Sequence, residues 1–200
     1  LVPEQFSLSS ERGLCETAGN GISRFAEAMT FKSLARRVFS EAGGLALTPL
    51  DTGGRLLAMY MAVSRMKAGE RLRVYNSVTS RPELMKRLVE TVSEFKLYGI
   101  KPEDLLFEGA GGLLPEKLCD LSYIYSAYDA VMTGDLRDPS DLLEMLAKKL
   151  GEGGYFRGRR VFVDGFNGFT PAEMKILSII ASGAGELTFC LCCDGHADDG

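Results

Sequence analysis

The sequence contains no tryptophan, only one histidine among its 200 residues, and no long hydrophobic run. The lone histidine, His196, leaves a single candidate for any catalytic scheme that needs an imidazole. No stretch approaches the roughly 18–20 apolar residues of a membrane helix, and no charged-then-apolar signal peptide opens the chain. Five cysteines, an odd number without secretory features, indicate reduced thiols. We therefore expect a cytoplasmic protein without a membrane span.

Positive charge is also scarce. The 23 Lys and Arg residues are outnumbered by 27 Asp and Glu residues, which gives a net charge of −4. A protein that binds nucleic acid through a broad basic surface usually has the opposite balance. The composition therefore argues against an independent DNA-binding domain, but it does not argue against a small local contact with DNA. Basic residues do gather at 36–37, 71–73, 86–87 and 157–160. The favoured interpretation of each group is a solvated face rather than a phosphate clamp.

The two ends of the chain have the pattern of an α/β domain. Continuous apolar runs such as Val161-Phe162-Val163 are typical of parallel strands that are covered on both faces. Thr170 as N-cap, Pro171 and Glu173 predict the start of a helix. Alternation of strands and helices predicts a parallel sheet domain formed by residues 1–49 and 155–200. The expected strands are Leu1–Phe6, Phe25–Phe31, Val161–Asp164 and Leu187–Cys193, and the other expected helices begin at Ser9 or Ser10 and at Ser33.

The middle of the chain shows helical periodicity and little strand pattern. Apolar residues recur at intervals of three and four, which is typical of amphipathic helices. Four such helices in a row predict an all-helical subdomain, residues 50–154, inserted into the sheet domain. The expected helices are Gly54–Lys67, Pro82–Tyr98, Pro115–Met132 and Ser140–Leu150.

Residues 160–173, RVFVDGFNGFTPAE, offer the clearest candidate site. A strand that ends in Asp164 places a carboxylate at the carboxyl edge of a parallel sheet, where α/β folds bind ligands and where nucleotide hydrolases orient magnesium. The alternative is a plain Asp-Gly turn. The next residue is Gly165 rather than a water-orienting glutamate, and no GxxxxGK[ST] phosphate loop occurs in the chain. These residues therefore form no complete ATPase site.

Two other groups have both a functional and a structural interpretation. Cys190, Cys192, Cys193 and His196 could bind zinc, but their spacing lacks the usual CxxC pairing and a strand would turn Cys193 away from its neighbours. Buried core cysteines are therefore favoured, and we expect no metal site. Phe166 and Phe169 could stack on bases, but packing anchors are the favoured interpretation.

Three segments resemble the N-terminal region of the AddB (RexB) subunits of bacterial ATP-dependent helicase–nuclease complexes. They are LVPEQFSLSSE, AMTFKSLARRVF and VFVDGFNGFTPAE. SEFKLYGIKPEDL, SYIYSAYDAVM and SDLLEMLAKKL resemble the same family in the same order. The resemblance covers effectively the whole chain. The VPEQF and DGFxGFTP patterns are its most specific parts.

The resemblance implies an incomplete RecA-like, P-loop NTPase-like sheet domain whose first strand and phosphate loop lie upstream. By position, Gln5 replaces a threonine that contacts single-stranded DNA in related helicases. Thr30, Phe31 and Lys32 correspond to a TFHS segment beside the DNA path, and Asp164 corresponds to the magnesium aspartate. Gly165 departs from the glutamate beside it, which suits a degenerate helicase.

The resemblance also implies properties of a longer parent protein. That protein would be an ATP-dependent hydrolase that resects DNA ends, with ATP and magnesium as cofactors, and with a nuclease domain and iron–sulfur cysteines downstream. It would form a heterodimer with an AddA-like (RexA-like) motor subunit, for which this region is a scaffold and a wall of the DNA path. The alternatives are an unrelated P-loop nucleotide-binding enzyme and a pure protein-interaction module.

Overall fold

The computed structural model describes residues 1–44, 50–66, 72–76, 81–106, 112–132 and 138–190. The chain folds as two compact units, one formed by Leu1–Gly44 and Leu142–Gly200 and the other by Leu45–Asp141. The first unit is mixed α/β and the second is helical. None of the helices in the described ranges is long and apolar enough to cross a membrane.

The α/β unit contains a parallel pair of strands, β1 (Arg160–Asp164) and β2 (Glu186–Cys190). Their register runs from Arg160 opposite Glu186 to Asp164 opposite Cys190. The backbone nitrogen of Leu1 donates to the Phe162 carbonyl oxygen, and the Asp164 N–H donates to the Leu1 carbonyl oxygen at 3.0 Å. Alternate residues of a strand direct their backbone groups to opposite edges. Leu1 therefore lies on the edge of β1 away from β2, so β1 makes backbone hydrogen bonds on both of its edges although the described sheet has two strands.

The predictions of strands at Leu1–Phe6 and Phe25–Phe31 are wrong. Only the first residues are extended, because Glu4–Phe6 forms a 3-10 helix, η1, and α1 (Ser7–Ala18) follows directly. A second 3-10 helix, η2 (Asn20–Arg24), precedes an irregular segment. The Val2 N–H donates to the Met29 carbonyl oxygen at 2.9 Å. Pro3 would face β1 as Leu1 does, but it has no N–H to continue that pairing.

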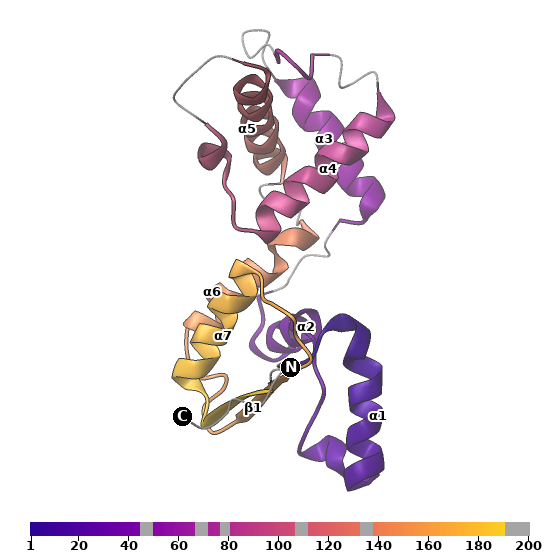
Figure 1. The fold of residues 1–200 in the computed structure, drawn as a ribbon, viewed down its shortest axis with the longest axis vertical. Helices are drawn as coiled ribbons and strands as arrows, with labels where there is room; N and C mark the ends of the chain where they lie inside the picture. Colours follow the sequence, from indigo (N-terminus) through magenta and orange to yellow (C-terminus); the bar gives the residue numbers. More distant parts are fainter. Residues whose placement is uncertain (45–49, 67–71, 77–80, 107–111, 133–137, 191–200) are drawn as a thin grey trace, which may run out of the picture. The chain divides into compact units, whose positions relative to one another are not determined.

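Capped helices cover the sheet on one face. Thr30 and Ser33 form a reciprocal capping box at the start of α2 (Phe31–Ala42), and Thr170 and Glu173 form another at the start of α7 (Pro171–Gly183). α6 (Leu142–Gly151) packs against both of these helices, as Figure 1 shows beside β1. Val161 and Val163 are buried while Phe162 is 52% exposed, so the prediction of a strand covered on both faces is wrong for the described residues.

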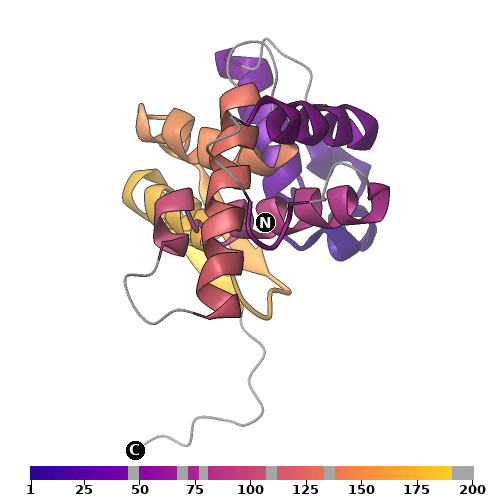
Figure 2. The ribbon, with the colours of Figure 1, turned by 90° about the horizontal axis from the view of Figure 1, so that it is seen from above.

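The helical unit is built from α3 (Thr52–Arg65), α4 (Pro82–Leu97), η4 (Pro102–Leu105), α5 (Leu113–Val131) and η5 (Pro139–Asp141). α3 packs against α4 and α5, and Figure 2 shows α5 running across the direction of α3. Met59, Leu88, Ile124 and Tyr128 form the centre of one hydrophobic core. All four helices expected in the middle of the chain are present, with small shifts at their ends.

The boundary between the units differs from the expected one. The sequence pattern places the helix near 140–150 in the inserted subdomain, 50–154, but α6 belongs to the α/β unit. It packs against α2 and α7, and its residues Leu146, Ala147 and Leu150 are buried. An apolar stripe shows that a helix needs a partner surface, but it does not say which surface.

Candidate functional site at the carboxyl edge of the sheet

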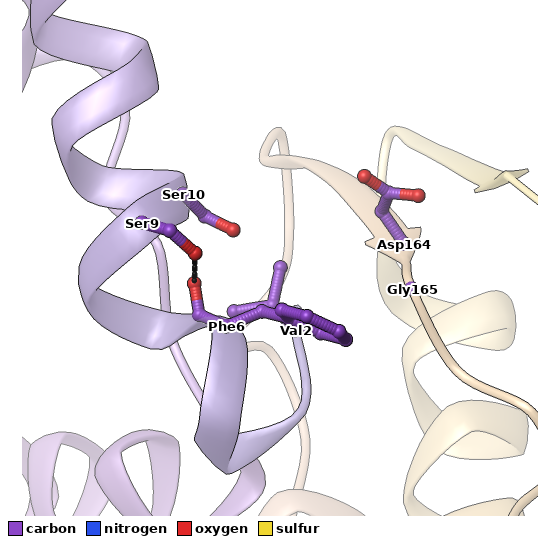
Figure 3. Close-up of a pocket in the computed structure, with 6 residues that line it drawn as sticks. All are labelled: Val2, Phe6, Ser9, Ser10, Asp164 and Gly165. Atoms are coloured by element: carbon purple, nitrogen blue, oxygen red, sulfur yellow. Dashed lines mark hydrogen bonds between the residues drawn. The ribbon is translucent and has the colours of Figure 1, made fainter.

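Asp164 is the last residue of β1, at the carboxyl edge of the sheet, as the strand pattern predicts. Its carboxylate is exposed and lines a pocket of about 300 Å³. Figure 3 shows Asp164 and the Ser10 hydroxyl of α1 on opposite sides of this pocket, with Val2 and Phe6 between them. The described residues that line the pocket are Val2, Phe6, Ser9, Ser10, Asp164 and Gly165.

The structure brings the three signature segments together at this edge. The Lys32 ammonium lies 4.0 Å from the Glu4 carboxylate, so the TFKS and VPEQF segments touch. The Phe31 ring meets the Phe166 ring edge-on, with centroids 5.6 Å apart, so TFKS also touches the DGF segment. Segments that are 130 residues or more apart in the chain therefore share one rim of the sheet.

The four residues assigned to a DNA path are not equally accessible. Gln5 in η1 and Lys32 in α2 are exposed at the rim. Thr30 and Phe31 are buried, at 5% and 4% exposure. The Thr30 hydroxyl accepts a hydrogen bond from the Ser33 N–H at 3.1 Å, which occupies it as a helix cap. Gln5 and Lys32 are thus the members of this set that can reach a ligand directly, while Thr30 and Phe31 hold the segment in place.

Gly165 has a backbone conformation that favours glycine, with φ +77°. A Cβ at this position would lie 3.3 Å from Cδ2 of Phe6 and 3.5 Å from Cδ of Pro3. The residue after Asp164 is therefore left-handed and closely covered by the VPEQF segment. A glutamate here would be strained and would meet the Phe6 ring, so the local geometry itself opposes a water-orienting carboxylate.

The pocket fits only a fragment of a magnesium–nucleotide site. Magnesium is usually held by one or two carboxylates together with substrate phosphates and water, and Asp164 supplies one carboxylate. No lysine or arginine lines the pocket among the described residues, and the described part of the chain contains no group of three potential metal ligands. The Ser9 hydroxyl is occupied, since it donates to the Phe6 carbonyl oxygen at 3.0 Å. Among the described residues, the pocket therefore lacks the groups that hydrolysis requires.

The aromatic residues beside the site contact one another in a row. Phe166 and Phe169 have ring centroids 4.9 Å apart, and Phe169 contacts Phe189 of β2 at 6.3 Å. Together with the buried Phe31, they join α2, the segment after β1, and β2. These contacts are those of packing anchors. Cys190 ends β2 and is exposed, so the prediction of a buried core cysteine is wrong at this position. Cys192, Cys193 and His196 lie outside the described residues.

A buried ionic cluster in the helical unit was not anticipated from the sequence. The Lys96 ammonium, 7% exposed, lies 2.9 Å from Asp129, 2.8 Å from Asp141 and 3.6 Å from Asp138. Arg55 approaches Asp138 from α3 at 3.5 Å. Burial opposes the charge on Lys96, but Asp141 and Asp129 raise its pKa overall. Because these residues lie up to 86 positions apart, no local spacing could have revealed the cluster.

Asp120 of α5 is a second buried charge that the sequence does not reveal. Its carboxylate, 2% exposed, accepts the backbone N–H groups of Arg73 at 3.1 Å, Val74 at 2.7 Å and Tyr75 at 3.0 Å. Three consecutive donors converge on one side chain, which fixes this short segment against α5. Both buried charges have structural roles.

Comparison with known proteins gives one consistent result. Residues 1–200 match the family described as "ADDB, N-terminal". Proteins from Moorella thermoacetica, Thermoanaerobacter sp. (strain X514) and Acetivibrio thermocellus are 36%, 35% and 34% identical to the chain over 203, 202 and 208 residues. The alignments cover 97%, 99% and 100% of this chain. Each relative is named as the B-type subunit of an "ATP-dependent helicase/deoxyribonuclease", and the chain spans only 17%, 17% and 18% of their lengths.

Proposed function

Because the chain belongs to the family of AddB N-terminal regions, we propose that it is part of the B-type subunit of an ATP-dependent helicase/deoxyribonuclease that resects DNA ends at double-strand breaks. The complete protein would act in the cytoplasm, with an AddA-like motor subunit as its partner. In this proposal the α/β unit is part of a RecA-like motor domain, and the helical unit is a subdomain inserted into it. This region then serves as a scaffold and as a wall of the DNA path.

One observation carries the proposal: the VPEQF, TFKS and DGFxGFTP segments meet at the carboxyl edge of the parallel sheet. Ligands of α/β folds bind at this edge. Gln5 and Lys32 are exposed there, where a DNA strand could contact them. The close approach of Phe6 to Gly165 opposes a water-orienting glutamate at this position. It therefore supports a rim that binds DNA and does not hydrolyse ATP.

Hydrolysis of ATP is assigned to the partner rather than to this site. Asp164 is one carboxylate without a second acid beside it, and no phosphate-binding cation lines the described pocket. ATP and magnesium therefore belong to the proposal for the complete assembly. Membership in the family leaves the alternative of an unrelated P-loop nucleotide-binding enzyme without support. The alternative of a protein-interaction module is compatible with the scaffold role.

The proposal can be tested on the complete protein purified with its partner. Gln5→Ala combined with Lys32→Ala should weaken binding of single-stranded DNA several-fold, because one polar and one ionic contact are lost. Lys175→Ala on exposed α7 is the matched control and should bind as the unmodified protein does. Binding and degradation of linear duplex DNA that are identical in all three proteins would overturn the DNA-path role.

The second test concerns ATP. The complete protein purified without its partner should show no ATP turnover that depends on Asp164, so Asp164→Ala should leave the measured rate at the background level. Turnover that is present in the unmodified protein and lost in Asp164→Ala would show that this site hydrolyses ATP.

A further inference from the structure

The exposed residues of α2 between positions 31 and 37 are all cations. Lys32, Arg36 and Arg37 are exposed, while Leu34 and Val38 face the core. Lys32 and Arg36 are four residues apart, so they lie one above the other on the helix surface. The cationic strip therefore begins at the rim of the sheet and continues along the helix away from it.

A second segment extends this strip. Glu41, near the end of α2, is bonded to the Arg37 guanidinium and lies 3.8 Å from the Arg159 guanidinium. Arg159 stacks over the Tyr155 ring, with 4.4 Å between its guanidinium carbon and the ring centroid. Arg157 is exposed two residues earlier. We call the set Lys32, Arg36, Arg37, Arg157 and Arg159 the α2 basic face.

The α2 basic face keeps an excess of positive charge in a chain whose net charge is −4. Its five cations meet three carboxylates, those of Glu4, Glu27 and Glu41. Arg36 and Arg157 form no ion pair with any residue in the described ranges. Arg160 is left out of the set, because it stands opposite Glu186 in the strand register.

The chemistry of this face favours phosphate over protein. Contacts to a nucleic-acid backbone are made mainly by Arg and Lys, and the planar guanidinium fork matches phosphate oxygens. Protein interfaces instead have an apolar centre. Five apolar residues of α2 are buried (Phe31, Leu34, Ala35, Val38 and Phe39), and only the small side chain of Ala42, at the end of the helix, is exposed. Stacking on Tyr155 also orders Arg159 in advance, which lowers the entropic cost of a contact.

We propose that the α2 basic face binds the phosphodiester backbone of DNA, as a sequence-independent contact that continues from the rim of the sheet along α2. The inference rests on the proposed function, and it adds residues of α2 and of the 157–159 segment to the DNA path. The excess of positive charge on this face is small, so we expect a local contact that positions DNA within a larger assembly. A chain that is acidic overall can provide such a contact.

The test uses the complete protein purified with its partner, and a labelled single-stranded oligonucleotide. Arg36→Glu with Arg157→Glu removes two cations that have no ion-pair partner in the described structure. Affinity at about 50 mM salt should fall roughly tenfold or more, and the slope of log K against log salt should decrease in magnitude by about 1.4, the value expected for two phosphate contacts to a single strand. Lys86→Glu with Arg87→Glu on exposed α4 is the matched control, with the same change in charge.

The outcomes separate the inference from the proposed function. Loss of affinity and slope in the Arg36/Arg157 variant alone supports the α2 basic face. Equal losses in both double variants would reveal a general charge effect and would overturn it. Unchanged DNA binding with loss of the motor partner would also overturn it and would assign the face to a protein. Lys32 belongs both to the rim and to the α2 basic face, so the Arg36/Arg157 variant decides between them. If the Gln5/Lys32 double variant weakens binding and the Arg36/Arg157 variant does not, the proposed function holds and the extension of the contact along α2 fails.

Discussion

Replacement of Lys96 by methionine should destabilise the helical unit strongly. Lys96 of α4 is the only cation that touches all three carboxylates of the described cluster, those of Asp129, Asp138 and Asp141. Methionine keeps an apolar stem of similar length beside Tyr125 and Tyr128, but it removes the charge. The variant therefore isolates the electrostatic contribution from the packing contribution.

The magnitude follows from the burial of the partners. Removal of one member of a buried ion pair typically costs about 3–5 kcal/mol, because the other charge stays buried without compensation. Asp138 has a fully buried side chain, but Asp129 and Asp141 are 41% and 32% exposed and partly hydrated. Water screens these two, so we expect a loss near the lower end, about 3 kcal/mol.

The loss should also depend on pH with a definite sign. Although burial acts against it, the Ser140 N–H, Lys96 and Arg55 hold the pKa of Asp138 below its usual value, whereas burial raises the pKa of Asp141 despite Lys96. Without Lys96 both folded-state pKa values rise. A carboxyl group whose pKa is raised in the folded state stabilises the fold at a pH below its unfolded-state pKa. This stabilisation is lost as the pH rises through the folded-state pKa. The deficit of Lys96→Met should therefore shrink as pH falls from about 7 to about 5.

Urea denaturation followed by far-UV circular dichroism measures this effect. Lys86→Met, on the exposed face of α4, is the matched control and should change stability by less than about 0.5 kcal/mol. A loss below about 1 kcal/mol for Lys96→Met would show that the cluster does not hold the unit together. A larger loss that is constant between the two pH values would contradict the explanation from the pKa values of Asp138 and Asp141.

Two further substitutions test the other structural assignments. Asp120→Asn should cost about 2–3 kcal/mol, since three N–H groups lose a carboxylate acceptor. Hydrogen exchange at residues 73–75 should accelerate, and Glu90→Gln on the exposed face of α4 should not reproduce this change. Gly165→Ala should cost about 1–3 kcal/mol in thermal unfolding, because φ is +77° and Phe6 is close. Gly168→Ala, where no atom lies within 4 Å of the added Cβ, should be nearly neutral, and equal effects at both glycines would contradict the account.

Local patterns determined much of this protein. Thr170, Pro171 and Glu173 specify the start of α7, because a capping box joins groups only three residues apart. The run Val161–Asp164 likewise specifies a short strand that ends in a carboxylate. Gln5 and Lys32 came from the family resemblance, since no spacing around them distinguishes a site. The strands expected near Leu1 and Phe25 failed, because a short apolar segment says little about its pairing partner.

Tertiary structure decided what distant segments do together. The meeting of Phe6 with Gly165, the packing of α6 with α2 and α7, and the ionic cluster around Lys96 all join parts of the chain far apart in sequence. Helix caps and apolar stripes are written within one or two turns, so they can be found by reading along the chain. The local sequence does not determine which apolar stripes pack together or which charges are buried together. Both depend on how the whole chain buries its surface. That choice is made only when the chain folds.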